Sequence, residues 1–175
     1  PAGKLQTAEG ASSCYECPAG HFCPEGSKTT IECGSAALYC PKHSATVSIA
    51  SAGKFTTPAM ASPTARVSEE PCPVGHACVG GLKFPCTALI SFQADVGQAS
   101  CSLCSTCAVG KFISSNCTTI SDTGCTSCEA GKFGDGTNSN CFDCDESGTV
   151  SSAGASRCTY CAAGEIPNAA KSSCR

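Results

Sequence analysis

Cysteine is the residue type in this sequence with the most chemistry to offer, and 19 of the 175 residues are cysteines. Paired cysteines can hold zinc, carry a redox disulfide or form structural bridges. A redox pair needs a βαβ context, which the sequence lacks. The C-x-x-C pairs overlap along the chain, so separate sets of four zinc ligands cannot be drawn. We therefore expect nine disulfides, one cysteine left over, and no metal or other cofactor. The pairs are Cys14/Cys17, Cys101/Cys104, Cys125/Cys128, Cys141/Cys144 and Cys158/Cys161.

Other side chains offer little for catalysis. The histidines His21 and His76 occupy the same slot after a repeated glycine, so we interpret them as exposed turn residues. No serine, histidine and aspartate stand in a catalytic order. The acidic run 143–146 lacks the EF-hand calcium pattern, and we interpret it as a solvated turn. The sequence therefore predicts a protein that is not an enzyme.

Composition excludes several further classes of protein. Charged residues make up 14% of the chain, aromatic residues 6%, and the net charge is −3. Such a chain has too few large apolar side chains for the core usual at this length. It has no basic patch for nucleic acid and no apolar run of about 18 residues to span a membrane. The many thiols suit an oxidising compartment, so we expect the protein outside the cell or at its surface.

A short repeat predicts the fold. The pattern C-x-x-G, followed by a polar and then an apolar residue, begins at Cys17, Cys72, Cys107, Cys128 and Cys161. Each unit should turn at its glycine, which suits a positive φ or a close approach, and close on a later cysteine. We expect a small disulfide-rich fold, an elongated rod of tandem cysteine-rich modules with short β-hairpins and almost no helix. The apolar residues after the glycine should pack on their own bridge or on the next unit: Phe22, Phe112, Phe133 and Ile166.

The cysteine spacing also predicts the domain boundaries. Two parts differ from the rest: a dense module and, after it, a segment without cysteine. We expect the first and last modules to be incomplete. In order, we expect a partial module at 1–16, a dense module at 17–43, a cysteine-free segment at 44–71, modules at 72–103 and 104–127, and a tandem of short modules at 128–175.

Local bridges follow from this repeat. The short tandem predicts Cys128–Cys141, Cys144–Cys158 and Cys161–Cys174. In the dense parts we expect Cys17–Cys33 with Cys23–Cys40, and Cys72–Cys86 with Cys78–Cys101; the main alternative there is Cys86–Cys101. The cysteine left over should be Cys14, with a partner before Pro1; the alternative is a free surface thiol.

The cysteine-free segment looks like a module that has lost its bridge. It keeps the Ala-Gly-Lys-Phe signature but has Ala50 in place of the opening cysteine. Residues 45–49 alternate apolar and polar, which predicts a short strand. Two interpretations stay open: a disordered, sugar-coated linker, or an arm that orders against a partner. The arm would make contact through Val47, Ile49, Phe55 and Met60.

Two stretches resemble known extracellular modules of the EGF-like kind. Cys17-Pro-Ala-Gly-His-Phe-Cys23-Pro-Glu-Gly-Ser27, with Tyr39-Cys40-Pro41, resembles the cysteine-rich repeat of ephrin receptors and of protist and algal surface proteins. The stretch 104–125 is similar to a module of tumour-necrosis-factor receptors. This second resemblance implies the crossed bridges Cys104–Cys117 and Cys107–Cys125. Together they imply an extracellular stalk, a receptor ectodomain, or the shaft of a surface filament such as a flagellar mastigoneme.

These observations favour a structural function. We expect a building block of an extracellular filament or flagellar appendage that associates with itself into a fibre through residues 44–71. Asn116-Cys117-Thr118 is an acceptor triplet for a glycan on Asn116. The alternative is a ligand-binding ectodomain or stalk of a cell-surface receptor. Receptors carry charged and aromatic loops, whereas the loops here are rich in Ser, Ala, Gly and Thr. A third possibility, a small disulfide-rich inhibitor or defence protein, would consist of one closed module instead of a tandem.

Overall fold

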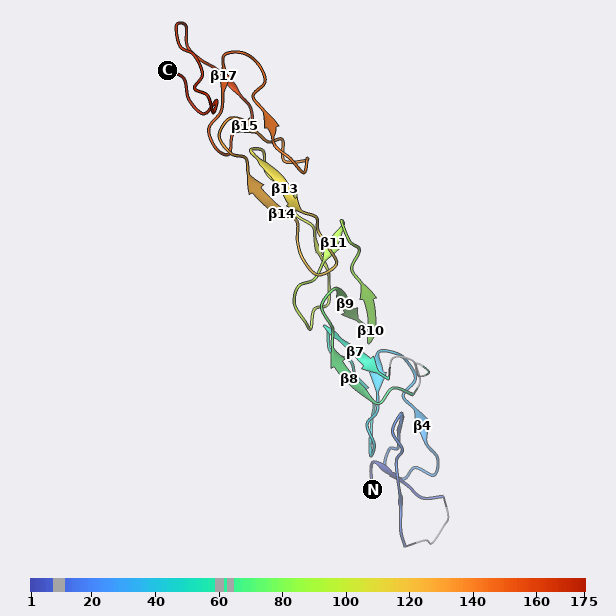
Figure 1. The fold of residues 1–175 in the computed structure, drawn as a ribbon. Helices are drawn as coiled ribbons and strands as arrows, with labels where there is room; N and C mark the ends of the chain where they lie inside the picture. Colours follow the sequence, from blue (N-terminus) through green and yellow to red (C-terminus); the bar gives the residue numbers. More distant parts are fainter. Residues whose placement is uncertain (8–11, 59–61, 63–64) are drawn as a thin grey trace. The chain divides into compact units, whose positions relative to one another are not determined.

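The computed structural model describes residues 1–7, 12–58, 62 and 65–175 of the chain (Figure 1). These described residues form nine two-stranded sheets and contain no α-helix. Nine disulfides join cysteines that lie 6 to 18 residues apart in the sequence. The predicted fold class is confirmed: the chain is built of small disulfide-rich modules with short β-hairpins. Nine bridges in a chain of this size also indicate an oxidising compartment.

The strands are short, since most contain two residues and the longest contains five. Each pairs with a neighbour in the sequence, so every sheet is a hairpin. The first nine are β1 Lys4–Leu5, β2 Tyr15–Glu16, β3 His21–Phe22, β4 Ile31–Glu32, β5 Leu38–Tyr39, β6 Ser48–Ile49, β7 Lys54–Thr57, β8 Ser68–Pro71 and β9 His76–Val79. The others are β10 Leu82–Pro85, β11 Ser91–Phe92, β12 Ser102–Leu103, β13 Lys111–Ser115, β14 Gly124–Ser127, β15 Lys132–Phe133, β16 Phe142–Asp143, β17 Thr149–Val150 and β18 Thr159–Tyr160.

The hairpin β15–β16 shows how one module is built. Gly131 has φ +85° and turns the chain into β15. Lys132 then lies opposite Asp143, with Nζ 3.5 Å from Oδ1, and Phe133 lies opposite Phe142, with ring centroids 5.3 Å apart. The Cys128–Cys141 bridge closes the hairpin just outside its strands. One aromatic pair and one bridge therefore replace a conventional core.

The chain divides into two compact units. The first contains Pro1–Cys86 and Gln93–Ser102, and the second contains Thr87–Phe92 and Leu103–Arg175. The division lies inside the module predicted at 72–103.

The buried interior of the described residues consists largely of bridges. Most of the hydrophobic residues that are buried are cysteines, and the only larger side chains among them are Phe55 and Val150. Phe55 packs with Cys72 and Cys78 in the first unit. The bridges therefore provide both the covalent constraint and most of the buried apolar surface.

Five bridges match the expected pairs. Three lie in the short tandem, and the other two are the crossed pair that the receptor resemblance implied. Cys14 is exposed and has no partner in the chain, as expected. The five bonds are Cys104–Cys117, Cys107–Cys125, Cys128–Cys141, Cys144–Cys158 and Cys161–Cys174.

The pairings expected in the dense parts are wrong. The structure has Cys17–Cys23, Cys33–Cys40, Cys72–Cys78 and Cys86–Cys101 in place of Cys17–Cys33, Cys23–Cys40, Cys72–Cys86 and Cys78–Cys101. The alternative Cys86–Cys101 is confirmed. In the two C-x5-C motifs, the turn at Gly20 or Gly75 brings the flanking Cα atoms to 5.9 and 5.6 Å. A loop this short closes at a lower entropic cost than the longer one we expected.

The cysteine-free segment is neither a linker nor a free arm where it is described. Strand β7 pairs with β8, and Phe55 forms an isolated parallel bridge with Gly81, beside β9 and β10. Of the strand expected at 45–49, only Ser48–Ile49 form a strand, β6, which pairs with β5. Arg66 takes over part of the role of the missing bridge, because its Nη1 donates to the carbonyl oxygens of Thr56 (3.0 Å) and Pro58 (2.7 Å).

The apolar residues after the glycines follow the expectation in part. Phe22, Phe112 and Phe133 are half-buried, and Phe133 packs on Phe142. Ile166 is 61% exposed, so the packing expected of it is absent. His21 and His76 begin strands β3 and β9 and are half-buried, so the interpretation as exposed turn residues was wrong.

Candidate functional site

In the structure each hairpin is one module, and the junctions between these hairpin modules are built around the repeated glycine. Gly3 accepts a hydrogen bond on its carbonyl from the N–H of Cys17 (3.1 Å) and donates its own N–H to the carbonyl of Cys23 in the next module (2.9 Å). Gly131 does the same with Cys144 (3.0 Å) and Ser151 (2.9 Å). The glycine therefore closes its own module and joins it to the next through backbone atoms alone. The same arrangement recurs at Gly20, Gly53, Gly75 and Gly110.

A second contact reaches one module further. A Cβ atom added to Gly53 would lie 1.9 Å from the carbonyl oxygen of Gly97, and one added to Gly110 would lie 2.0 Å from that of Gly154. Contacts of this length are impossible for a real side chain. At these positions the backbone of one module packs directly against the module after the next within the same unit, which explains why the repeat needs glycine there beyond its positive φ. The same close approach joins Gly3 to His43 and Gly131 to Ala170.

Apolar side chains recur at the C-x-x-C pairs and face solvent. Four of the five pairs enclose such a residue, and a monomer gains no stability from exposing it. Tyr15 and Phe142 directly follow the first cysteine of their pairs, whereas Leu103 and Tyr160 directly precede the second. Because neighbouring residues in a strand face opposite sides, the two sets lie on opposite faces of their local strands. Exposed apolar groups can serve as contact sites for other molecules where they gather into a patch. Their exposed fractions are 66% for Tyr15, 78% for Leu103, 42% for Phe142 and 71% for Tyr160.

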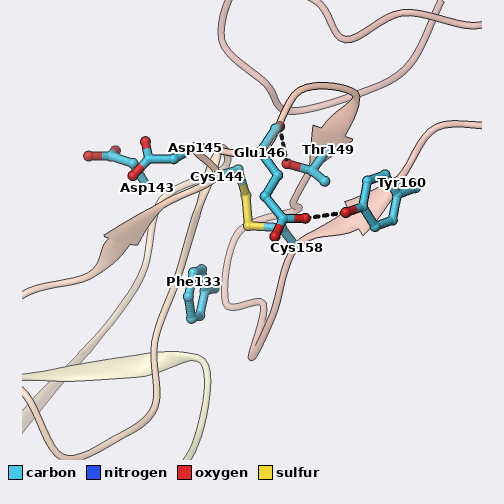
Figure 2. A pocket seen from close by; sticks show the side chains of 8 residues that line it. All are labelled: Phe133, Asp143, Cys144, Asp145, Glu146, Thr149, Cys158 and Tyr160. Carbon is cyan, nitrogen blue, oxygen red and sulfur yellow. Dashed lines mark hydrogen bonds between the residues drawn. A yellow bond between two sulfur atoms is a disulfide. The ribbon is translucent and has the colours of Figure 1, made fainter.

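A recess of about 290 Å³ lies beside one bridge of the second unit (Figure 2). The Tyr160 hydroxyl donates to the Glu146 carboxylate, and this hydrogen bond raises the pKa of Tyr160. Thr149 Oγ1 donates to the backbone carbonyl of Glu146 (2.7 Å), which fixes the turn between β16 and β17. The recess can therefore receive a small group against aromatic and carboxylate side chains. It is lined by Phe133, Asp143, Cys144, Asp145, Glu146, Thr149, Cys158 and Tyr160.

The acidic side chains of the run 143–146 do not converge on one point. Figure 2 shows Asp143 and Asp145 directed away from Glu146, which is engaged with Tyr160. Asp143 also lies across the hairpin from Lys132. Within the described ranges, no group of three or more His, Cys, Asp or Glu side chains is placed to hold a metal ion.

The spacing Cys125-x2-Cys128-x12-Cys141-x2-Cys144 is one that a zinc ribbon could use. Cys125, Cys128, Cys141 and Cys144 belong to three different bridges, so their sulfur atoms are already bonded. Asn116, the expected glycan acceptor, is exposed directly after β13. Its glycosylation remains a prediction.

The structure does not bring the four expected contact residues together. Phe55 is only 9% exposed and belongs to the core of the first unit, so assigning it to a contact arm was wrong. Val47 is half-buried, and Ile49 is 73% exposed on β6. Met60 lies outside the described residues.

Sequence reasoning missed Arg66, which is 5% exposed. The one available signal was a single arginine in a stretch rich in Ala, Pro, Ser and Thr. Its backbone carbonyl also accepts from the N–H of Cys40 (3.0 Å), so the residue links the unbridged module to the preceding one.

Comparison with known protein families and with curated proteins found no match. No helix long and apolar enough to cross a membrane occurs among the residues that the structure describes. The chain is therefore assigned to the class of tandem disulfide-rich modules from its bridges and hairpins alone.

Proposed function

We propose that this chain is a structural building block of an extracellular filament or cell-surface appendage. The observation that carries the proposal is the recurring junction, in which a glycine bonds to the next module and, at most of these junctions, also packs against the one after it. Such a junction joins neighbouring modules through backbone atoms, so surface side chains remain available for contacts with other molecules. This suits a load-bearing protein better than a protein with one specialised site.

Self-association is the second part of the proposal. Exposed apolar side chains occur at C-x-x-C pairs in both units, so each unit offers such groups to a partner. A second copy of this chain presents the same groups. Contacts that repeat along two chains without closing would propagate a filament. Small polar loops between these contacts leave room for glycans, including one on Asn116.

The resemblances agree with this function. The module at 17–43 resembles the ephrin-receptor repeat found in protist and algal surface proteins, and the module at 104–127 is similar to a tumour-necrosis-factor-receptor module. Both kinds build extracellular stalks, and the first resemblance also extends to filament shafts.

A ligand-binding receptor ectodomain is the second candidate. The crossed bridges Cys104–Cys117 and Cys107–Cys125 favour it, since this pairing is the one that the receptor resemblance implies. Asp122 braces the same module by accepting from the N–H and hydroxyl of Ser105, both at 2.6 Å. The recess beside Tyr160 would be its binding site.

Removal of the exposed apolar groups tests the filament. The variant Tyr15→Ser/Leu103→Ser/Tyr160→Ser should stay monomeric at concentrations where the wild-type chain forms fibres. The matched control is Val96→Ser/Val109→Ser/Ile120→Ser, which changes residues of 64%, 66% and 52% exposure outside the C-x-x-C pairs. It should assemble normally. Sedimentation velocity and negative-stain electron microscopy provide the measurements.

Two results would count against the proposal. A wild-type chain that stays monomeric at every concentration, with its bridges intact, would overturn the filament. Normal fibres from the triple C-x-x-C variant would overturn the contact that we propose.

A further inference from the structure

A second recess, of about 180 Å³, lies in the first unit between the hairpins β7–β8 and β9–β10. Pockets for drug-sized ligands begin at about 300 Å³, so this recess fits a single small group. Two of its side chains are cationic and none is acidic. It is lined by Phe55, Thr56, Arg66, Gly81, Leu82 and Lys83.

Arg66 is the unusual member of this set. Its side chain is almost fully buried, and both of its hydrogen bonds run from Nη1 to neutral carbonyl oxygens. Its Nε is buried without any hydrogen-bond partner. No carboxylate among the described residues forms an ion pair with it. A buried charge and a buried N–H without an acceptor each cost free energy, which a ligand that supplies both an acceptor and a negative charge would recover.

Lys83 brings a second positive charge to the recess. It lies on β10, with Nζ 4.8 Å from the centroid of the Phe55 ring, so the ring holds the ammonium group over the recess. Neither Glu69 nor Glu70 forms an ion pair with it. Glu69 is bound by Lys54 Nζ (2.6 Å), and Glu70 is exposed across the hairpin from Phe55 and forms no ion pair with any described residue.

The polar groups of the recess point to an anion. The hydroxyl of Thr56 is already used, because it donates to the carbonyl of Ala36 (2.6 Å). Recognition is therefore left to the guanidinium and the ammonium. A guanidinium pairs with carboxylate and sulfate through a fork of N–H donors, and an ammonium adds a point charge.

We propose that this recess binds one oxyanion group, a sulfate or a carboxylate, between Arg66 and Lys83. The group can come from a free ion or from an acidic saccharide, because both present the same oxygens. The site does not depend on assembly, since every residue that forms it lies in one unit of a single chain.

Titration with inorganic sulfate at constant ionic strength tests this proposal, with chloride as the reference salt. Amide resonances of residues 56 and 83 should shift and saturate. Lys83→Gln should weaken sulfate binding about two- to fivefold, as for a partly exposed charge pair. Arg66→Lys keeps the charge but loses the fork, and should weaken it about tenfold or more. The matched control Lys4→Gln, at an exposed lysine outside the recess, should bind as wild type.

Titration with glucose 6-sulfate, with glucose as its control, shows whether the oxyanion comes from a free ion or from an acidic saccharide. Tighter binding of the sulfated sugar than of sulfate would assign an acidic saccharide, and equal binding would assign the free ion. Absence of saturable binding by either would overturn the proposal, as would unchanged affinity in both Arg66→Lys and Lys83→Gln. If Arg66→Lys does not fold, Lys83→Glu decides, because its exposed position leaves folding intact and reversal of the charge should abolish binding.

Discussion

Replacement of Gly110 by alanine tests the module junction most sharply, because the structure provides a matched control in the same contact. Gly110 and Gly154 both have positive φ, +85° and +73°. A Cβ on Gly110 would lie 2.0 Å from the carbonyl oxygen of Gly154, whereas a Cβ on Gly154 would meet nothing within 4 Å. The two variants therefore share the backbone strain and differ in the collision.

The expected destabilisation follows from these contacts. An L-residue in the left-handed region costs about 1–2 kcal/mol, so Gly154→Ala should lose about that much. Gly110→Ala should lose a further 1–3 kcal/mol or so from overpacking. The N–H of Gly110 also donates to Gly134 (2.7 Å), and its carbonyl accepts from Cys128 (2.9 Å). If both bonds weaken, the total should reach about 3–5 kcal/mol.

Denaturant unfolding with the bridges oxidised measures the difference between the two variants. Hydrogen exchange then locates it, because the amides of Gly110, Cys128 and Gly154 should lose protection in Gly110→Ala and largely keep it in Gly154→Ala. Equal destabilisation by both substitutions would refute the close approach between alternate modules, and would leave positive φ as the only reason for glycine.

Three further predictions concern pairs of residues. The hydrogen bond from Lys54 lowers the pKa of Glu69. The pair's contribution to stability is therefore present above about pH 4.3 and is lost as the pH falls through the lowered pKa of the folded state. Glu69→Gln should reduce this loss of unfolding free energy at acid pH, measured by denaturant unfolding at several pH values. Peptide mapping without reduction should recover Cys17 linked to Cys23, and a link to a later cysteine would contradict the turn geometry. Arg66→Met should destabilise the first unit by about 1–3 kcal/mol, because it leaves two carbonyl oxygens unpaired; unchanged denaturation would contradict that role.

The tandem of hairpins could be predicted from spacing because each short module offers one bridge partner. In the segment 128–175 an opening cysteine meets only one closing cysteine before the next module begins, so the pairing follows directly. In the dense module 17–43 four cysteines lie close together, and several pairings fit the same spacing. The turn at Gly20 decides between them, and its effect depends on backbone geometry rather than on the number of intervening residues.

The folding of the cysteine-free segment could not be predicted for a different reason. Its stability comes from contacts with distant residues, such as the N–H of Thr56 donating to Gly81 (3.0 Å) and the hydroxyl of Thr56 donating to Ala36. No periodic pattern in the sequence predicts such contacts. For the same reason Phe55 was assigned to a surface, although it packs on the Cys72–Cys78 bridge. The recess beside Arg66 was likewise invisible in the sequence.

Immunogold electron microscopy of the native material tests the structural function most directly. Antibodies raised against the folded chain, with bridges intact, would be applied to intact cells and to isolated extracellular material. The filament proposal predicts gold particles at regular intervals along fibres or surface appendages. Label spread over the cell surface as isolated particles, with no labelled fibre, would contradict the filament and would favour the receptor ectodomain.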